Sequence, residues 1–536
     1  MLVPQNSISL YSRSKILRCL LAVLLILFVP VHPLPAKNSE APLRIPLDPL
    51  GFQPLSSQFL LAGSSLFTLH FVDDHHLLLT FAVHRLLSRL PDEPEDDQDR
   101  NMDALLLELP SGRVLARTSW RLHDHGRYLW SLGQGIFLLR IRDTLTSFAP
   151  LANLASGEPF REKPFLIARD RRIGAVILSP TADLLIVESV PRTHRSHPKT
   201  PLFGPTPLPE RSPEPTSVQI NFYRISVPLD GKQDNVQVRF AGGGRSNAMG
   251  TIASTSSGYL RLLDQGHQQW AFDFDSYTGE TKELSPFDST CRPEPYFVSP
   301  SEFIAFGCRS GETRHLLGEF NMRGEEKWEQ NLFGDYIAPS FVFAPSSGRF
   351  ALSRILVSSS VVSDQPLSSE ELNSQTVVVF QTDSGKQILH VDCSPIEPAG
   401  QNFALSPNGL NLAVVHGGAI EVYSLPTLTG KEDAAVKIAQ ASAPAPNQAP
   451  IRFGADDTDN AAGSEATDTL SPGAYRGVAG GGDVQSPAPA SADSSSRLAE
   501  EPEPLGDQSP DKPRKPPTLY TLPTDPPRSP AGNEPQ

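Results

Sequence analysis

The sequence predicts an all-β fold, a single β-propeller of seven blades. Between residues 170 and 425 one pattern recurs: an apolar stretch, Ser-Pro or Ala-Pro, a small polar turn and a second apolar strand. The pattern is clearest at residues 175–187, 296–306, 342–352 and 403–414. Hairpins that repeat at wide and fairly even intervals are typical of propellers, in which each blade is a four-stranded antiparallel sheet.

The second half of each unit supports this architecture. Residues 317–330, 377–390 and 420–431 each read as a strand and a polar loop with glycine, which supplies the positive φ of a tight turn. We count seven units, with GTIASTSSGYLRLL at 250–263 as a degenerate one. They begin near residues 67, 123, 166, 240, 292, 338 and 399. Counts of six or eight blades stay open, because the first two units lack the Ser-Pro signature.

Residues 1–36 have the composition of a secretory signal peptide. Basic residues precede an apolar run over 19–31, and small residues follow at the expected cleavage site. The run has about 13 residues, fewer than the ~20 that span a bilayer. We therefore expect cleavage before Lys37 and a secreted or periplasmic protein. The alternative is an uncleaved membrane anchor formed by residues 16–31.

The remaining chain divides by composition. Residues 37–58 are punctuated by proline and read as an extended leader, whereas strand-like periodicity over 59–437 defines the propeller. Residues 438–536 are rich in Ala, Pro, Ser and Gly and carry too little apolar surface to offset the entropy of ordering the chain. We predict a disordered tail there. A proline-rich insertion at 192–217 is either a binding loop or solvated filler.

Charge and cysteine content limit the partners and the compartment. The formal net charge is −14, and removal of residues 1–36, with three basic residues and no acidic residue, changes it to −17. Nucleic-acid binding needs clustered Lys and Arg, so we exclude it. Three cysteines remain in an exported chain. Cys291 and Cys308 flank one strand hairpin, which predicts a disulfide between them and leaves Cys393 over.

The last unit carries a resemblance to known propellers. LSPNGLNLAVVHGGAIEVYSLPTLTGK at 405–431 is similar, almost position for position, to the hairpin pair of WD40-like and YVTN-type β-propellers. The resemblance covers roughly residues 60–435 and implies the propeller architecture, although no unit ends in Trp-Asp. It implies no particular activity, because the same fold hosts enzymes and pure binding scaffolds.

Histidines and aspartates gather in three places that resemble parts of metal sites. Residues two apart in a strand face the same side, so His123 and His125 could reach one ion, but the sequence fixes no third ligand. We interpret this pair as solvated turn residues. The same interpretation applies to the other two groups, Asp73-Asp74-His75-His76 and His194 with His197. The sequence therefore predicts no metal site.

Two glycine-rich motifs lack the context that their chemistry requires. Gly242-Gly243-Gly244 follows an apolar strand but opens no helix that could bind phosphate, so we read it as a turn between blades. His416-Gly417-Gly418 has the form of an oxyanion-hole triplet but falls where the repeat places a turn, and no Gly-x-Ser-x-Gly supplies a nucleophile. We predict no catalytic and no cofactor-binding residues, and we expect the four tryptophans to pack between blades.

The sequence favours an exported, monomeric, non-catalytic binding or scaffolding protein whose partner is another protein or an envelope component. A rigid ring, an acidic surface and a long tail without convergent catalytic residues support this hypothesis. The alternative is a propeller hydrolase, of the lactonase or glycosidase kind, with a metal ion or carboxylates at the central channel. No membrane span is expected once the signal peptide has been removed.

Overall fold

The computed structural model describes twelve stretches of the chain. They are residues 41–52, 67–83, 100–122, 127–168, 171–191, 218–246, 252–309, 314–333, 335–357, 372–393, 401–453 and 470–472. The chain divides into two units, residues 1–478 and 479–536, and all described residues lie in the first unit. The predicted signal peptide, the 192–217 insertion and residues 473–536 lie outside the described residues.

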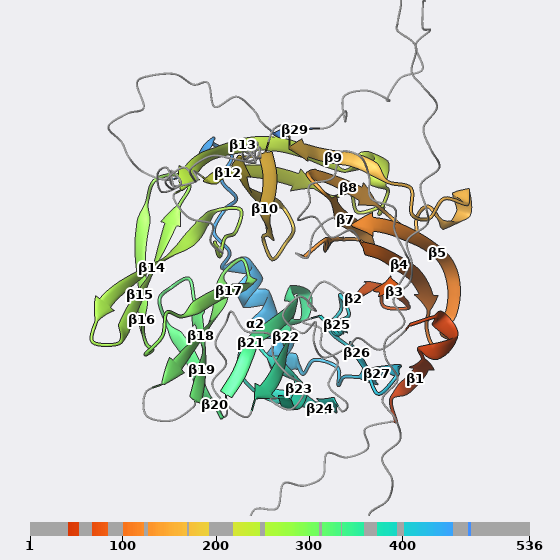
Figure 1. Cartoon of the computed structure of the whole chain (residues 1–536). Helices are drawn as coiled ribbons and strands as arrows, with labels where there is room; N and C mark the ends of the chain where they lie inside the picture. Colours follow the sequence, from red (N-terminus) through yellow and green to blue (C-terminus); the bar gives the residue numbers. More distant parts are fainter. Residues whose placement is uncertain are drawn as a thin grey trace, which may run out of the picture. The chain divides into compact units, whose positions relative to one another are not determined.

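The described strands form seven sheets, which are the blades of a seven-bladed propeller (Figure 1). The predicted fold class and blade number are confirmed. We number the blades 1 to 7 in chain order, starting at β2. Successive strands within each blade pair antiparallel, so every blade is a meander whose first strand is at one edge.

The first four blades span residues 67–288. Blade 1 contains β2 (Phe67–Asp73), β3 (His76–Val83), β4 (Arg100–Glu108) and β5 (Arg113–Leu122). Blade 2 contains β6 (Leu129–Gly133), β7 (Ile136–Ile141), β8 (Thr144–Phe148) and β9 (Lys163–Ala168). Blade 3 contains β10 (Arg171–Leu178), β11 (Leu184–Pro191), β12 (Val218–Ser226) and β13 (Gln237–Ser246). Blade 4 contains β14 (Gly258–Gly266), β15 (Gln269–Ser276) and β16 (Thr281–Asp288).

The last three blades follow the same plan. Blade 5 contains β17 (Glu294–Ser299), β18 (Glu302–Arg309), β19 (Arg314–Asn321) and β20 (Glu326–Phe333). Blade 6 contains β21 (Asp335–Ala344), β22 (Arg349–Val357), β23 (Leu372–Gln381) and β24 (Gln387–Cys393). Blade 7 contains β25 (Phe403–Leu405), β26 (Asn411–His416), β27 (Ala419–Ser424) and β1 (Leu43–Pro46).

The ring closes through β1, which pairs antiparallel with β27 from Leu43 opposite Val422 to Pro46 opposite Ala419. One blade is thus built from both ends of the ring, so the first and last blades cannot separate without breaking a sheet. These four residues belong to the stretch that the sequence assigns to an extended leader. The interpretation of these residues as an extended leader is therefore corrected: they form the fourth strand of blade 7. The sequence did not reveal this strand, because four residues between prolines are too few to show an alternation of apolar and polar residues.

The Ser-Pro signature marks the turn from the first strand to the second strand of a blade. In blade 7 the hydroxyl of Ser406 accepts a 2.9 Å hydrogen bond from the amide of Asn411 and donates a 2.7 Å bond to Asn408 Oδ1. In blade 3 Ser179 plays the same part for Asp183 and Leu184. A serine hydroxyl at this position satisfies turn amides that no strand neighbour reaches.

Seven apolar clusters hold the blades together, one at each junction of neighbouring blades. The cluster between blades 7 and 1 includes Ile45 of β1, and the one between blades 5 and 6 includes Phe350 and Phe380, with stacked rings 5.1 Å apart. Because each blade buries both faces against its neighbours, the core is a ring of interfaces rather than one centre.

Blade 4 contains the degenerate unit predicted at 250–263. Its first strand is reduced to an isolated bridge between Ser254 and Tyr259, and β14 follows directly. The unit start predicted near residue 240 is wrong, because β13 belongs to blade 3 as its fourth strand. A run of glycines hid this strand in the sequence.

The chain continues as ordered structure after the ring has closed. Helix α2 (Gly430–Ala441) follows blade 7, and Figure 1 shows it near the first strands of blades 5 and 6. Strand β28 (Ile451–Phe453) then pairs parallel with β13 of blade 3, and β29 (Leu470–Pro472) pairs with β9 of blade 2. We call residues 430–453 the strap. The tail that the sequence places from residue 438 therefore begins no earlier than the end of β28.

The glycine triplet is the docking site of the strap. Gly242, Gly243 and Gly244 lie within β13 and pair with β28 in parallel register, so the predicted turn between blades is wrong. A Cβ atom on Gly242 or Gly244 would overlap a carbonyl oxygen of β28. The missing side chains thus allow two backbones to approach closely.

The predicted disulfide is present. Cys291 and Cys308 are joined, and their Cα atoms are 5.4 Å apart. Cys393 stays a thiol and is buried in the cluster between blades 6 and 7. Among the helices of the described chain, none has the length and apolar character needed to cross a membrane.

Candidate functional site

Helix α2 begins at a capping box that the sequence encodes as Thr-x-x-Glu. Thr429 accepts a hydrogen bond from the amide of Glu432, and the Glu432 carboxylate accepts a 2.7 Å bond from the amide of Thr429. Two amides without helical partners are thereby satisfied. Val436 is buried, and it packs so closely on Gly348 of blade 6 that a Cβ at Gly348 would lie 2.7 Å from its methyl group.

The strap is held by groups from successive blades. Just before the strap begins, the guanidinium of Arg349 of blade 6, a fully buried side chain, donates 2.7 Å bonds to the carbonyls of Gly409 and Pro426. In blade 4 the carbonyl of Ser256 accepts a 3.1 Å bond from the strap amide of Asn447. In blade 5 the hydroxyl of Ser301 donates a 2.6 Å bond to the carbonyl of Ala439. In blade 3 Arg224 donates to two carbonyls of the strap, those of Gln448 and Ala449.

A groove of about 570 Å³ lies beside the C-terminal half of α2. Its other walls are the β15–β16 turn of blade 4 and the β17–β18 and β19–β20 turns of blade 5. Apolar side chains of both the strap and the blades line it: Phe274, Met322, Ala435, Ile438, Ala439 and Pro444. Ile438 is 62 % exposed and presents its apolar side chain to this cavity. We call this cavity the α2 groove.

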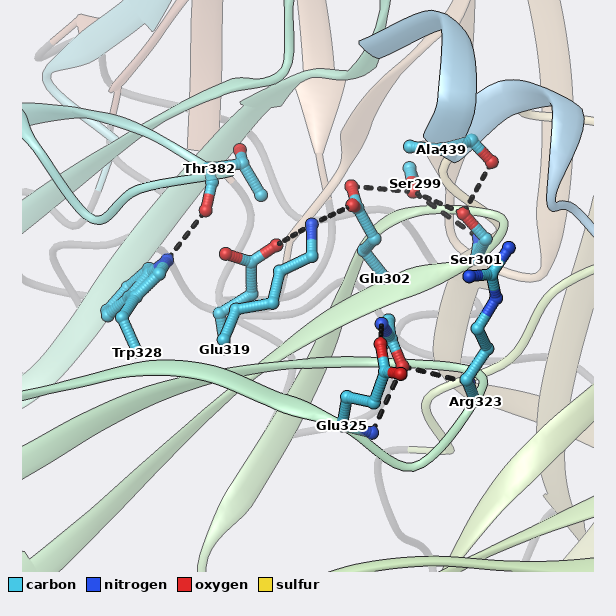
Figure 2. Close-up of polar contacts among 11 residues, drawn as sticks. Ser299, Ser301, Glu302, Glu319, Arg323, Glu325, Trp328, Thr382 and Ala439 are labelled. Carbon is cyan, nitrogen blue, oxygen red and sulfur yellow. Dashed lines mark hydrogen bonds and ion pairs between the residues drawn. The ribbon is translucent and has the colours of Figure 1, made fainter. Parts of the chain in front are cut away.

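Three ionisable side chains of blade 5 meet at one wall of the α2 groove (Figure 2). The ammonium of Lys327 donates to a carboxylate oxygen of Glu302 and lies 3.4 Å from Oε1 of Glu319. The Glu319 side chain is fully buried and that of Glu302 is 9 % exposed. A single cation therefore serves two carboxyl groups that are removed from water.

Burial sets the protonation state of Glu319. Burial raises the pKa of Glu319 to about 9, although the nearby ammonium of Lys327 opposes this shift. Oε2 of Glu319 is buried and has no hydrogen-bond partner among the described residues. A carboxyl group in this environment carries a proton at neutral pH. Glu302 is then the one carboxylate that neutralises Lys327.

The β19–β20 turn places a cation at the mouth of the groove. Oδ1 of Asn321 accepts hydrogen bonds from the amides of Arg323 and Glu325, and the Asn321 amide group donates a 2.7 Å bond to the Glu325 carboxylate. Gly324 has φ +87° and completes the turn. Figure 2 shows Arg323 extending from this turn toward Ser301 and α2.

Three of the four tryptophans, Trp120, Trp130 and Trp328, pack in the apolar clusters at blade junctions, as expected. Trp120 and Trp130 are 4 % exposed and belong to the clusters on either side of blade 2. The indole of Trp270 donates a 3.0 Å bond to the carbonyl of Ser289. The indole of Trp328 donates a 2.7 Å bond to the carbonyl of Thr382, which ties blade 5 to blade 6 (Figure 2).

The motifs that the sequence singled out lie elsewhere. Asp73 and His76 face each other across the β2–β3 turn at 2.8 Å, as solvated turn residues do. His416 lies 2.9 Å from Glu421 across the β26–β27 turn, and Gly417 and Gly418 have positive φ. The interpretation of His416-Gly417-Gly418 as an ordinary turn is confirmed.

Several candidate residues fall outside the described residues: His123, His125, His194 and His197. Within the described part of the chain, no three His, Cys, Asp or Glu side chains are placed to hold one metal ion. On β2, the pKa of His70 is lowered to about 3 by burial and by Arg127, so its imidazole is neutral.

A second cavity, of about 700 Å³, lies where blades 7 and 1 meet. Its walls include Asp74 and His75 from the β2–β3 turn and Asn408 and Asn411 from blade 7. Apolar side chains line it as well: Leu43, Leu109, Leu410, Val422 and Leu425. Among the described residues, however, no ion pair joins its lining side chains, whereas Glu302 and Lys327 are paired in the wall of the α2 groove. We therefore place the candidate site in the α2 groove.

The sequence contained one signal for this site that the repeat pattern obscured. Thr429 and Glu432 follow the last repeat at the spacing of a capping box, and a stretch of good helix formers comes next. The grouping of Glu302, Glu319 and Lys327 had no such signal, because it depends on the pairing of β18, β19 and β20.

Comparisons with known proteins show no family for this chain. No protein-family model matches the sequence, and no curated protein matches it. Among solved structures, an oligogalacturonate lyase in complex with manganese is 12 % identical with a TM-score of 0.35, over 67 % of this chain and 96 % of that one. The C-terminal WD40 domain of Sif2 is 8 % identical with a TM-score of 0.29, over 68 % and 97 %. The sheet topology itself shows that the chain is a seven-bladed β-propeller.

A third similar structure is an acylaminoacyl peptidase of Pyrococcus horikoshii. It is 8 % identical with a TM-score of 0.37, and the match covers 71 % of this chain and 55 % of that one. Similarities at these identities and TM-scores carry no argument about the function of this chain. The function has to be argued from the α2 groove itself.

Proposed function

We propose that this propeller is an exported, monomeric, non-catalytic binding protein that holds a segment of a partner protein in the α2 groove. The observation that carries the proposal is the chemistry of the groove. It combines apolar walls with a serine hydroxyl and a carboxylate that are already engaged. The hydroxyl of Ser301 donates to the carbonyl of Ala439, not to a base, and Glu302 is paired with Lys327. A nucleophile or a general base needs a group released from such contacts.

The shape of the site also favours binding of a protein segment. Two blades and a helix that contacts blades 5 and 6 through Ala439 and Val436 border the α2 groove, so it is pre-formed. Pre-formed apolar sites bind without the entropy cost of ordering the site. The 62 % exposed side chain of Ile438 offers the kind of apolar anchor that central contacts of interfaces use.

Export is supported by the Cys291–Cys308 disulfide, because structural disulfides persist in oxidising compartments. We expect sequencing of the mature protein from its native host to give Lys37 as the first residue. A first residue before position 19, with the apolar run retained, contradicts cleavage and supports the anchor formed by residues 16–31. Recovery in the membrane fraction after a high-salt wash distinguishes the anchored form from a protein that is bound peripherally.

Replacement of Ile438 by Glu is expected to abolish binding of the partner. Ile438 is exposed, so the substitution leaves the fold intact but puts a charge where an apolar contact forms. We expect a loss of at least about 10-fold in partner recovered on the immobilised full chain from an envelope extract, measured by quantitative mass spectrometry. The matched control is Leu229→Glu, at an apolar residue that is 89 % exposed and outside the groove.

Two results contradict this proposal. The first is equal recovery of the same partner by the Ile438→Glu and Leu229→Glu variants, which places the contact outside the α2 groove. The second is turnover of a sugar, a lactone or a peptide by the purified full chain.

A further inference from the structure

The α2 groove contains an unbalanced positive charge. Its ionisable residues are Glu280, Lys282, Glu302, Arg323 and Lys327. Glu302 and Lys327 neutralise each other, and the adjoining Glu319 is protonated because burial raises its pKa to about 9. Two cations and one anion remain, on a chain whose formal net charge is −14. Such a local reversal of sign favours an anionic group on the bound partner.

Arg323 is the cation best placed to receive that group. The Asn321 side chain fixes the backbone of the turn through two hydrogen bonds, and it also engages the carboxylate of Glu325. Glu325 is therefore held by Asn321 rather than by Arg323. No hydrogen bond or ion pair of the Arg323 guanidinium is found among the described residues. Its position is fixed at the backbone while its five donors are open to a ligand.

The other cation, Lys282, has a different role. Its ammonium donates a 2.6 Å bond to the carbonyl of Met322, the residue before Arg323. The hydroxyl of Ser285 also donates to the carbonyl of Gly324. Blade 4 thus holds the β19–β20 turn of blade 5 through two hydrogen bonds. Because the Lys282 ammonium is engaged by a carbonyl, it adds positive charge to the groove without competing with Arg323 for a carboxylate.

Apolar surface lies directly beside Arg323. Met322 is 7 % exposed and forms part of the cluster between blades 4 and 5, and Phe274 of β15 belongs to the same cluster. Ile438 faces the groove from the helix. A guanidinium next to an apolar surface selects a ligand that carries a carboxylate close to a large apolar side chain.

We propose that the α2 groove binds a protein segment in which an acidic residue lies next to a large aliphatic or aromatic residue. This proposal rests on the binding function proposed above and names the chemical class of the partner. The carboxylate pairs with Arg323, and the apolar side chain packs on Phe274, Met322 and Ile438.

Selection of a phage-displayed random heptapeptide library on the immobilised, oxidised full chain tests the proposal. We expect the selected peptides to share Asp or Glu within two positions of Leu, Ile, Met or Phe. Their affinity, measured by fluorescence polarisation of synthetic copies, should fall about 10-fold with Arg323→Gln, because one charge-assisted pair is lost. The affinity of the peptides for the native chain should also fall when salt is added, because salt screens the charge pair.

The control variant is Arg292→Gln. Arg292 is an exposed arginine that precedes β17 of the same blade, at the end of the strand away from Ser301, and it is not part of the groove. This variant should bind the peptides as the native chain does. A second variant, Arg323→Glu, should select Lys or Arg in place of the acidic residue, a result that a merely destabilised turn would not produce.

Three outcomes separate this inference from the proposed function. Loss of binding with both Ile438→Glu and Arg323→Gln supports both. Peptides that lose binding with Ile438→Glu but carry no acidic residue and are indifferent to Arg323→Gln overturn the inference and leave the binding function standing. Peptides that are indifferent to both variants, or no enriched peptide at all, overturn the groove as the binding site and the inference with it.

Discussion

Replacement of Glu319 by Gln is expected to remove a pH dependence of stability that amounts to several kcal/mol. Burial raises the pKa of Glu319 from 4.5 to about 9 in the folded chain. Between these values the folded state holds a proton that the unfolded state has released. The free energy of unfolding therefore falls as the pH rises through this window.

The size of the effect follows from the proton count. Each pH unit inside the window changes the free energy of unfolding by about 1.4 kcal/mol, so the native chain should lose about 4 kcal/mol relative to Glu319→Gln between roughly pH 5.5 and 8.5. Gln keeps the shape of the protonated carboxyl group, so the variant should fold. Urea unfolding at several pH values gives the free energy of unfolding against pH for the native chain and for Glu319→Gln.

A control variant distinguishes titration from plain destabilisation. Leu317 is fully buried two residues before Glu319 on β19, on the same face of the strand. Leu317→Val should lower the free energy of unfolding by about 1 kcal/mol at every pH. If Glu319→Gln shows the same pH slope as the native chain, Glu319 is not protonated in the folded state and the charge balance of the α2 groove is wrong.

Replacement of Gly244 by Val is expected to release the end of the strap. A Cβ at this position would overlap the carbonyl oxygen of Phe453, so β28 and the substituted β13 cannot pair. Ile451, which is 1 % exposed, would then leave the cluster between blades 3 and 4. Loss of this burial together with the paired backbone costs about 3–4 kcal/mol.

Hydrogen exchange reports the release directly. Amides of residues 451–453 should lose protection in Gly244→Val, and proteolysis should cut within residues 442–450, while β10 to β12 stay protected. The control is Gly430→Ala at the start of α2, where a Cβ meets no atom within 4 Å. Unchanged protection of residues 451–453 in Gly244→Val would show that the strap does not depend on these glycines.

The repeat pattern predicts the ring of blades, but it predicts neither the strand that closes the ring nor the pairing of the strap with blade 3. Apolar hairpins with Ser-Pro turns are local, so residues 175–187 and 403–414 reveal their blades from sequence alone. Strand β1 has four residues and is defined only by pairing with β27, some 370 residues later. The sequence of Gly242–Gly244 is typical of a turn, and only its pairing with β28 shows that it belongs to a strand. Long-range pairing of this kind leaves no periodic trace.

The candidate site was out of reach of the sequence for a related reason. Glu302, Glu319 and Lys327 are three among many charged residues, and only the register of β18, β19 and β20 brings them together. Helix α2 was within reach, because Thr429 and Glu432 form a capping box before a run of helix formers.

The central claim, that a partner protein is held in the α2 groove, is tested most directly by a photoreactive amino acid at position 438 of the full chain in its native host. We expect a cross-link to one partner protein. The cross-link should be lost when a peptide selected from the phage-displayed library, with an acidic residue next to a large apolar residue, is added in excess. The same amino acid at position 229, which is also exposed, should give no such cross-link. Equal cross-linking from both positions, or none from position 438, would contradict the account.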